Sequence, residues 1–179
     1  MKAYRDIILR EVTGVLANVD ERASEQFARA LARAKRVYIT GVGRSGLVVK
    51  AFGQRLMHMG FDVHLADEIT APGISRGDVL VACSGTGETE LTAYMAKKAR
   101  SIRARVVVLT ARPRSPLGRL GDLTILVPAP LERGEGSRQP ARSLFEQALF
   151  IYLDSIVLTM MQELHISEAR MRRRHSNLE

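Results

Sequence analysis

The segment DVLVACSGTGET, residues 78–89, begins as a nearly continuous apolar run and ends in a loop of glycines and hydroxyl-bearing residues. An apolar run of this length is typical of a buried parallel strand. The loop residues that could hold a ligand are Ser84, Gly85, Thr86, Gly87 and Thr89. Clustered hydroxyls, together with the free amides of a following helix, match the three anionic oxygens of a phosphate monoester. The segment therefore predicts a strand–loop–helix unit that holds a phosphate group.

An earlier segment of the chain has the same plan. Residues 36–46, RVYITGVGRSG, run from an apolar strand into a glycine-rich loop that opens a helix. Gly43 lets the backbone approach a ligand closely, while Arg44 and Ser45 add a cation and a hydroxyl. Because the loop leads into a helix N-terminus, free amides and the positive end of the helix dipole favour an anion there.

The earlier loop also matches the G-x-G-x-x-G pattern of dinucleotide-binding domains. Asp67 and Glu68 follow the next predicted strand about twenty residues later, where such domains place the acid that binds the ribose. A Rossmann domain that binds NAD is therefore an alternative. The later loop favours a phosphate monoester instead, because a dinucleotide site needs no second cluster of hydroxyls.

Both segments belong to a regular alternation of strands and helices. Short apolar runs predict strands at residues 36–40, 61–65, 78–83, 104–110 and 122–127. Helical patterns at 47–59 and 89–100 lie between them. This alternation predicts an α/β fold with a five-stranded parallel sheet flanked by helices. A flavodoxin-like order, 2-1-3-4-5, would bring the two loops together at the switch point, where ligands bind in such sheets.

The chain is expected to form a single domain over residues 1–179. Its expected parts are N-terminal helices at 1–34, the sheet core at 35–127, a loop or lid at 128–140, and a long C-terminal helix with a tail at 141–179. Asp20 is the predicted N-cap of the second helix. Residues 143–164 are apolar around much of the helix circumference, which is typical of a helix buried on two sides. We expect the second side to face another copy of the chain.

The composition narrows the classes of partner. The net charge of +8 and the pI of about 10.2 suit an anionic ligand. Aromatic residues make up 5% and Trp is absent, so the stacking surfaces that bind single-stranded nucleic acid are scarce. No apolar run is expected to span a bilayer. The single cysteine, Cys83, cannot form a disulfide within the chain, so the cysteine content does not indicate an oxidising compartment. We expect a cytoplasmic protein. The four histidines lack the spacing of a metal site.

Several stretches resemble one known family. VACSGTGET at residues 81–89 resembles the phosphate-loop signature of sugar isomerase (SIS) domains, and GVGRSG at 41–46 lies where that family has its first ligand loop. Three further stretches resemble 6-phospho-3-hexuloisomerases: RLMHMGFDV at 55–63, SLFEQALFIYLDSIV at 143–157 and RRHSNLE at 173–179. The resemblance covers essentially the whole chain.

The resemblance implies an isomerase that interconverts D-arabino-3-hexulose 6-phosphate and fructose 6-phosphate through an enediolate, with no cofactor and no metal ion. It implies a homo-oligomer, with a tetramer favoured, and no nucleic-acid or membrane partner. It also implies a place in the ribulose monophosphate pathway, in formaldehyde assimilation or pentose supply, with 3-hexulose-6-phosphate synthase as a pathway partner.

Such a reaction needs a base, donors for the enediolate oxygens and a phosphate anchor. Glu146 lies in the apolar sequence LFEQALFIYL, a setting that strengthens a carboxylate as a base. His175, in the matching tail, is the candidate acid/base for opening the sugar ring. His58, near a predicted helix end, is a further candidate. Glu88 competes with Glu146, but its charge beside the phosphate would repel the substrate unless it turns away.

Three other functions stay open at this point. A different SIS isomerase, such as one of the arabinose 5-phosphate type, would use the same loops. A non-catalytic sugar-phosphate sensor would use them too, although the N-terminal helices lack the basic recognition face of a helix-turn-helix. The NAD-binding domain is the third.

Overall fold

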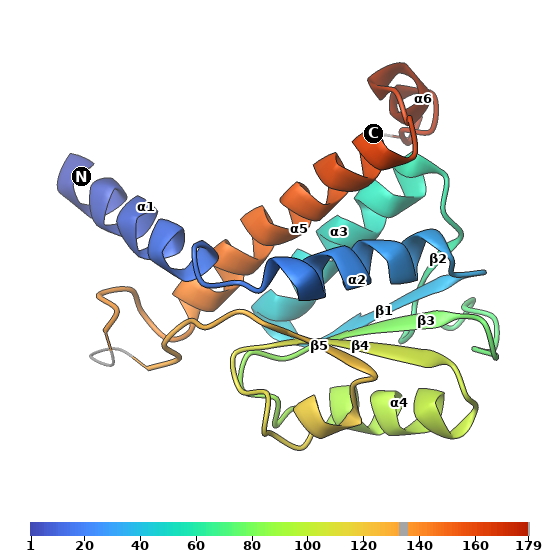
Figure 1. Ribbon diagram of the computed structural model, residues 1–179, viewed down its shortest axis with the longest axis horizontal. Helices are drawn as coiled ribbons and strands as arrows, with labels where there is room; N and C mark the ends of the chain where they lie inside the picture. Colours follow the sequence, from blue (N-terminus) through green and yellow to red (C-terminus); the bar gives the residue numbers. More distant parts are fainter. Residues whose placement is uncertain (133–135, 179) are drawn as a thin grey trace.

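The computed structural model describes residues 1–132 and 136–178, and its centre is a parallel β-sheet (Figure 1). The strands are β1 (Val37–Gly41), β2 (Val63–Leu65), β3 (Val79–Cys83), β4 (Arg105–Thr110) and β5 (Leu123–Leu126). They pair in the order β2-β1-β3-β4-β5, and every pairing is parallel. The predicted fold class and strand order are both confirmed.

The register of the sheet brings the two predicted ligand loops side by side. Gly41, the last residue of β1, lies opposite Cys83, the last residue of β3. Neighbouring strands are about 4.8 Å apart, so the loops that begin at Val42 and Ser84 leave the sheet next to each other. The carboxyl edge of the sheet between β1 and β3 is therefore the switch point that the predicted order requires.

Helices cover both faces of the sheet. They are α1 (Lys2–Leu16), α2 (Glu21–Ala32), α3 (Gly43–Met59), α4 (Glu90–Ser101), α5 (Ser143–Glu163) and α6 (Glu168–Arg172), with a 3₁₀ turn η1 (Gly118–Leu120) before β5. Figure 1 shows α2, α3 and α5 on one face and α4 on the other. α1 extends away from the body near the start of α5, whereas α6 lies at the opposite end of α5 (Figure 1).

Each buried strand contributes to two apolar cores, one on each face. Val79, Val81 and Cys83 of β3 pack with α3 and α5 on the larger side. The alternate residues Leu80 and Ala82 pack towards α4. Side chains of a strand point to opposite faces in turn, so a sheet covered on both faces needs apolar residues at every position. This is why the β3 segment reads as a continuous apolar run.

α5 carries both buried and exposed apolar side chains. Phe145, Leu149 and Leu153 are buried, but Ile151 and Leu158 are 48% and 67% exposed. By length and composition α5 could cross a membrane, which corrects the expectation that no apolar run could do so. In its most apolar 18-residue window 56% is buried inside the protein, so internal packing accounts for much of this apolarity.

The helix ends follow the predicted signals with one difference. The Asp20 side chain accepts a hydrogen bond from the Ala23 amide at 3.1 Å, which confirms it as the N-cap of α2. α3 ends at Met59, where the predicted helix also ends, and Gly60 follows it with φ of +105°. However, α3 begins at Gly43 rather than Leu47, because the Gly46 amide already bonds to the Val42 carbonyl at 3.2 Å. The first ligand loop is thus the first turn of α3.

Two predicted segments are described only in part. The loop or lid predicted at 128–140 includes residues 133–135, which lie outside the described residues. Residue 179, at the end of the predicted tail, lies outside them as well. The described part of the loop runs without regular structure up to Ser143, where α5 begins.

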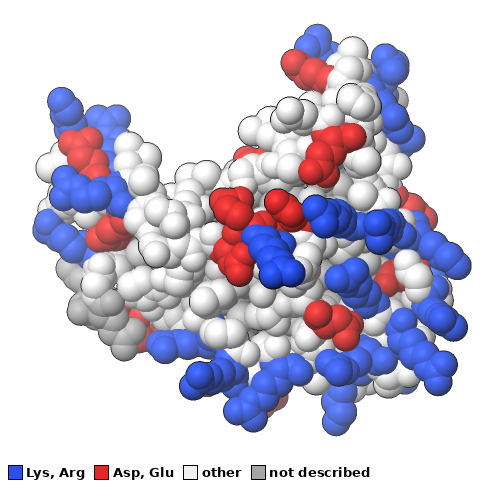
Figure 2. Space-filling view, in the orientation of Figure 1, with Lys and Arg blue, Asp and Glu red and all other residues white. Residues whose placement is uncertain are grey.

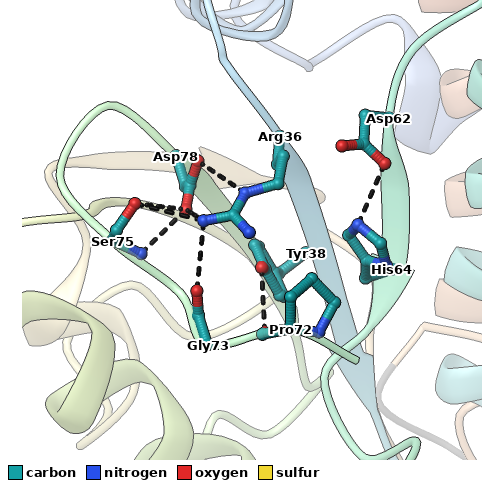
Figure 3. A network of polar contacts seen from close by, with 8 residues as sticks. All are labelled: Arg36, Tyr38, Asp62, His64, Pro72, Gly73, Ser75 and Asp78. Carbon is teal, nitrogen blue, oxygen red and sulfur yellow. Dashed lines mark hydrogen bonds and ion pairs between the residues drawn. The ribbon is translucent and has the colours of Figure 1, made fainter. Parts of the chain in front are cut away.

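A polar network at the other edge of the sheet holds the connection between β2 and β3 (Figure 3). Asp78 is buried and accepts two hydrogen bonds from the Arg36 guanidinium, at 2.8 and 3.3 Å. The same guanidinium bonds to the Gly73 carbonyl and the Ser75 hydroxyl, both at 3.1 Å. Because Arg36 and Asp78 precede β1 and β3, this network lies at the amino edge of the sheet, away from the ligand loops.

Candidate active site

The first loop depends on glycines for its shape. A Cβ on Gly46 would lie 2.4 Å from the Gly41 carbonyl oxygen, so only glycine permits this close turn between β1 and α3. Gly43 has φ of +60°, which other residues rarely adopt. Between these glycines the Arg44 side chain is largely exposed, and Ser45 is half-buried. The loop thus presents a cation, a hydroxyl and a helix N-terminus at the edge of the sheet.

The second loop is a connected set of hydroxyls and amides. The buried Ser84 hydroxyl lies 2.8 Å from the Thr89 hydroxyl and accepts a hydrogen bond from the Gly87 amide at 3.0 Å. The Thr86 hydroxyl accepts from the Glu88 amide at 3.2 Å. A Cβ on Gly87 would lie 1.8 Å from the Ser115 hydroxyl oxygen, so the loop packs tightly against the segment after β4. These contacts hold the predicted phosphate-loop residues together in one compact turn.

The first turn of α5 packs against this second loop. A Cβ on Gly85 would lie 3.0 Å from the Phe145 ring, so glycine makes room for α5 to approach. Glu146 follows Phe145 and is only 7% exposed. Burial raises the pKa of the Cys83 thiol at the end of β3, and the charge of nearby Glu146 raises it further. A thiol held protonated in this way is a packed side chain and no nucleophile.

Glu146 is paired with Arg44 of the first loop. Its carboxylate oxygen Oε2 accepts a hydrogen bond from Arg44 Nε, and the two side chains form an ion pair. The Arg44 side chain is 63% exposed, whereas that of Glu146 is 9% exposed. The guanidinium therefore lies on the solvent side of a carboxylate that is otherwise enclosed.

A cavity of about 720 Å³ adjoins the second loop. Thr86 and Glu88 are among the residues that line it, together with Glu132 and three arginines: Arg112, Arg114 and Arg142. Arg142 lies 3.9 Å from Glu132. These arginines were not predicted from the sequence, although ARPRSP follows β4 at the carboxyl edge of the sheet, where parallel α/β folds bind ligands. Three arginines against two glutamates leave an excess of positive charge in the lining, which favours anions.

The two predicted histidines lie together but at the other end of α3. The rings of His58 and His175 stack with centroids 4.9 Å apart. A Cβ on Gly60, which ends α3, would lie 3.3 Å from Arg170 Nη2, so α6 packs at this end of the helix. His58 is 15 residues beyond Gly43, which corresponds to about 22 Å along the helix axis. Within one chain, neither histidine is near Glu146.

The structure therefore unites one part of the predicted site and separates another. The loop residues Gly43, Arg44, Ser45, Ser84, Gly85, Thr86, Gly87 and Thr89 gather with Glu146 at the carboxyl edge of the sheet. His58 and His175 form a second cluster elsewhere. Across residues 1–132 and 136–178, no group of three or more His, Cys, Asp or Glu side chains could hold a metal ion.

Known proteins are similar to this chain in sequence and in fold. The family model of the SIS domain matches residues 30–153, which include both loops and Glu146. A 3-hexulose-6-phosphate isomerase of Bacillus subtilis (strain 168) is 37% identical over 176 residues, covering 96% of this chain and 95% of that protein. Another 3-hexulose-6-phosphate isomerase, of Mycobacterium gastri, is 37% identical over 176 residues, with coverages of 97% and 88%.

A solved structure has the same fold as this chain. A crystal structure from Methanococcus jannaschii, described as inferring a molecular function of 3-hexulose-6-phosphate isomerase, is 29% identical and superposes with a TM-score of 0.88. The match covers 99% of each chain. The resemblance seen in the two loops and the C-terminal stretches is thus confirmed over nearly the full length, and the chain belongs to the SIS domain family.

Proposed function

We propose that this protein is an isomerase that interconverts D-arabino-3-hexulose 6-phosphate and fructose 6-phosphate. The observation that carries the proposal is the position of Glu146, a buried carboxylate beside two loops suited to a phosphate group. Relatives named for this reaction at 37% identity over nearly the whole chain support the choice of substrate. The reaction moves a carbonyl between C3 and C2 and requires only proton transfer.

In the proposed mechanism Glu146 is the base. Its carboxylate takes the proton from one of the two carbons, and the electrons form a 2,3-enediolate. A proton then passes from one enediolate oxygen to the other, and the same carboxylate returns the carbon-bound proton to the neighbouring carbon. Arg44 first turns from Glu146 to the substrate, which uncovers the carboxylate. The guanidinium then stabilises the negative charge that develops on the enediolate oxygens.

The two loops anchor the phosphate group. Ser45, Ser84, Thr86 and Thr89 supply hydroxyls, while Gly43, Gly85 and Gly87 leave the backbone accessible. Ser84 has two roles, because its hydroxyl also accepts a hydrogen bond from the Gly87 amide and so maintains the shape of the loop. The arginines of the adjoining cavity attract the doubly charged substrate and raise its local concentration.

A second copy of the chain completes the site with His175. Fructose 6-phosphate must open its ring, and an imidazole is suited to carry that proton. His175 is too distant to reach the Glu146 of its own chain, whereas exposed apolar side chains on α1 and α5, including Tyr4 and Leu158, favour association between copies. We propose a homo-oligomer, with a tetramer favoured. His58 holds the ring of His175 by stacking and remains the second histidine candidate.

The proposed setting is the cytoplasm, where the ribulose monophosphate pathway would use this step for formaldehyde assimilation or pentose supply. The substrate would then come from 3-hexulose-6-phosphate synthase. No cofactor, metal ion, nucleic acid or membrane takes part in the proposed reaction.

The alternatives differ in what they bind and convert. An arabinose 5-phosphate isomerase would act on a pentose phosphate and leave 3-hexulose 6-phosphate untouched. A sensor would bind the sugar phosphate without turnover. An NAD-binding domain is disfavoured, since the SIS match spans both loops and Asp67, one of the two acids expected to bind the ribose, lies 3.5 Å from Lys50.

The deciding experiment assays fructose 6-phosphate formation from 3-hexulose 6-phosphate, with arabinose 5-phosphate and NAD tested beside it. Glu146→Gln keeps the shape of the side chain and removes its basicity. Turnover should fall by roughly 10²-fold or more, and deuterium uptake from solvent into fructose 6-phosphate should fall in step. Glu163→Gln, an exposed glutamate at the other end of α5, is the matched control. If Glu146→Gln takes up deuterium at the parent rate, Glu146 is not the base, and Glu88 or a histidine is tested next.

A further inference from the structure

Glu11 of α1 is a carboxylate with three donors from a distant segment. Its Oε2 accepts hydrogen bonds from the Ser137 hydroxyl at 2.8 Å and the Gln139 side-chain amide at 3.0 Å. Its Oε1 accepts from the Arg138 backbone amide at 2.9 Å. Ser137 and Gln139 are themselves buried, 7% and 6% exposed. One side chain of α1 therefore holds three consecutive residues that lie more than 120 positions away in the chain.

The surroundings keep this carboxylate ionised. Burial acts to raise the pKa of Glu11, but the hydrogen bonds from Arg138, Gln139 and Ser137, together with the charge of Arg138, outweigh it and lower the pKa overall. An ionised acceptor forms stronger hydrogen bonds than a neutral one.

The segment that Glu11 holds leads directly into the first turn of α5. Ala141 and Arg142 follow it with φ of +20° and +66°, and two such non-glycine residues in succession cost free energy. The Ser143 amide bonds to the Pro140 carbonyl at 3.0 Å, and the Glu146 amide bonds to the Arg142 carbonyl at 3.3 Å. The position of Glu146 thus depends on a strained entry that other contacts must maintain.

We propose that Glu11 is a positioning residue for Glu146, because its hydrogen bonds to residues 137–139 maintain the entry into α5. The inference rests on the proposed function in one respect, the role of Glu146 as the base. Glu11 contacts neither ligand loop, so it acts on the base and leaves the phosphate anchor alone. Its main effect is therefore on turnover, with a smaller effect on substrate affinity through Arg142 of the cavity.

The test uses Glu11→Ala in the full-length protein, with kinetics and amide hydrogen exchange over residues 137–147. The value of kcat should fall by about tenfold or more, as small displacements of a reacting group do. The KM should stay within about twofold, since the loops on β1 and β3 keep their place. Amides 143–147 should exchange faster than in the parent protein. Unchanged kcat, or unchanged exchange at 143–147, overturns the inference.

A conservative variant separates positioning from general stability. Glu11→Gln keeps an oxygen for the Arg138 amide, and the Gln139 side chain can turn its Oε1, which has no hydrogen-bond partner, towards the new amide. It should recover most of kcat and of the exchange protection. If Glu11→Ala fails to fold, Ser137→Ala removes one donor to Glu11 together with the acceptor of the Gln139 amide, and it should loosen the same entry into α5.

Two further variants make the outcomes distinguishable. Glu25→Ala removes a 58% exposed glutamate of α2 that pairs with Arg29 of the same helix, and it should change neither readout. Glu146→Gln with full turnover would refute the proposed base, whereas the exchange measurement on Glu11→Ala does not depend on which residue is the base. A loss of protection confined to α1 would show that Glu11 merely tethers that helix, and would overturn the inference.

Discussion

Arg44, in the first turn of α3, forms an ion pair with Glu146, in the first turn of α5. The two residues are 102 positions apart, and their contact joins the two halves of the chain at the carboxyl edge of the sheet. Glu146 is enclosed while Arg44 is largely exposed, so Arg44 is the partner that can leave. Solvent screens the exposed guanidinium, and the oxygens of a bound sugar phosphate can compete for it.

Arg44→Met is therefore expected to lower kcat/KM by roughly 10- to 100-fold, because a hydrogen bond to a charged group contributes about 1.5–3 kcal/mol. The melting temperature should change little. Steady-state kinetics and thermal unfolding check the two expectations. Arg55→Met removes an exposed arginine from a later turn of α3 and is the control. Equal kcat/KM in the two variants would mean that Arg44 makes no contact with the substrate.

Ser84→Ala should weaken substrate binding by roughly 10- to 100-fold, the scale of a lost hydrogen bond to a charged group. The variant also leaves the Gly87 amide without its acceptor, so the loop itself should loosen. Isothermal titration with fructose 6-phosphate measures the binding. Ser101→Ala, at the far end of α4, removes an exposed hydroxyl that donates a hydrogen bond to the Lys98 carbonyl, and it is the control. Equal affinities in the two variants would remove Ser84 from the anchor.

The sequence predicted the sheet well because local periodicity carries most of the information about strands. The run at 78–83 is apolar throughout, and the structure covers both faces of β3. Asp20 and Gly60 act where their chemistry predicts, since helix caps depend on one or two neighbouring residues. The start of α3 was misplaced because glycines read as loop, while here Gly43 and Gly46 lie inside the first helical turn.

The site was predicted in part. The loops at the ends of β1 and β3 meet because strand order alone determines which strand ends are neighbours. Two contacts of the site join residues that are more than 100 positions apart in the chain. They are the ion pair between Arg44 and Glu146 and the hydrogen bonds between Glu11 and residues 137–139. No periodicity encodes such contacts. The stacking of His58 on His175 likewise depends on how the tail folds back onto the end of α3.

Asp78→Asn is expected to destabilise the protein without altering the site. Removing one partner of a buried ion pair costs on the order of 3 kcal/mol, and Asp78 is completely enclosed beside Arg36. The network lies at the amino edge of the sheet (Figure 3), so kcat of the folded variant should stay normal. Urea unfolding and kinetics at 25 °C test both. A large loss of kcat in a folded variant would show that the two edges are coupled.

The stability contributed by Asp78 should depend on pH. Burial acts to raise the pKa of Asp78, but hydrogen bonds from Arg36 and Ser75 outweigh it and lower the pKa overall. A lowered carboxyl pKa stabilises the folded state fully above the unfolded value of about 3.9, and this contribution disappears as the pH falls through the folded pKa. The free energy of unfolding should therefore fall more steeply below about pH 4 in the parent protein than in Asp78→Asn. Parallel curves would contradict the assignment.

Figure 2 shows a mostly uncharged hollow, bordered by acidic residues, between the projecting α1 and the end of α5 that carries α6. Exposed apolar residues at such a surface favour a second copy of the chain. Analytical ultracentrifugation at micromolar concentration should therefore find an oligomer. A fully active monomer would refute the proposed assembly.

The same assembly predicts that two defective variants restore one another. Glu146→Gln lacks the base but keeps His175, whereas His175→Ala keeps the base. If each site takes Glu146 from one copy and His175 from another, random mixing leaves intact Glu146 in half of the sites, and intact His175 reaches half of those. About a quarter of the parent activity should return after the subunits of a closed symmetric oligomer are unfolded and refolded together. Glu146→Gln mixed with Arg44→Met is the control, since those residues share one site within a chain, and this mixture should gain nothing. Without recovery in the first mixture, His175 acts in its own chain or has no catalytic role.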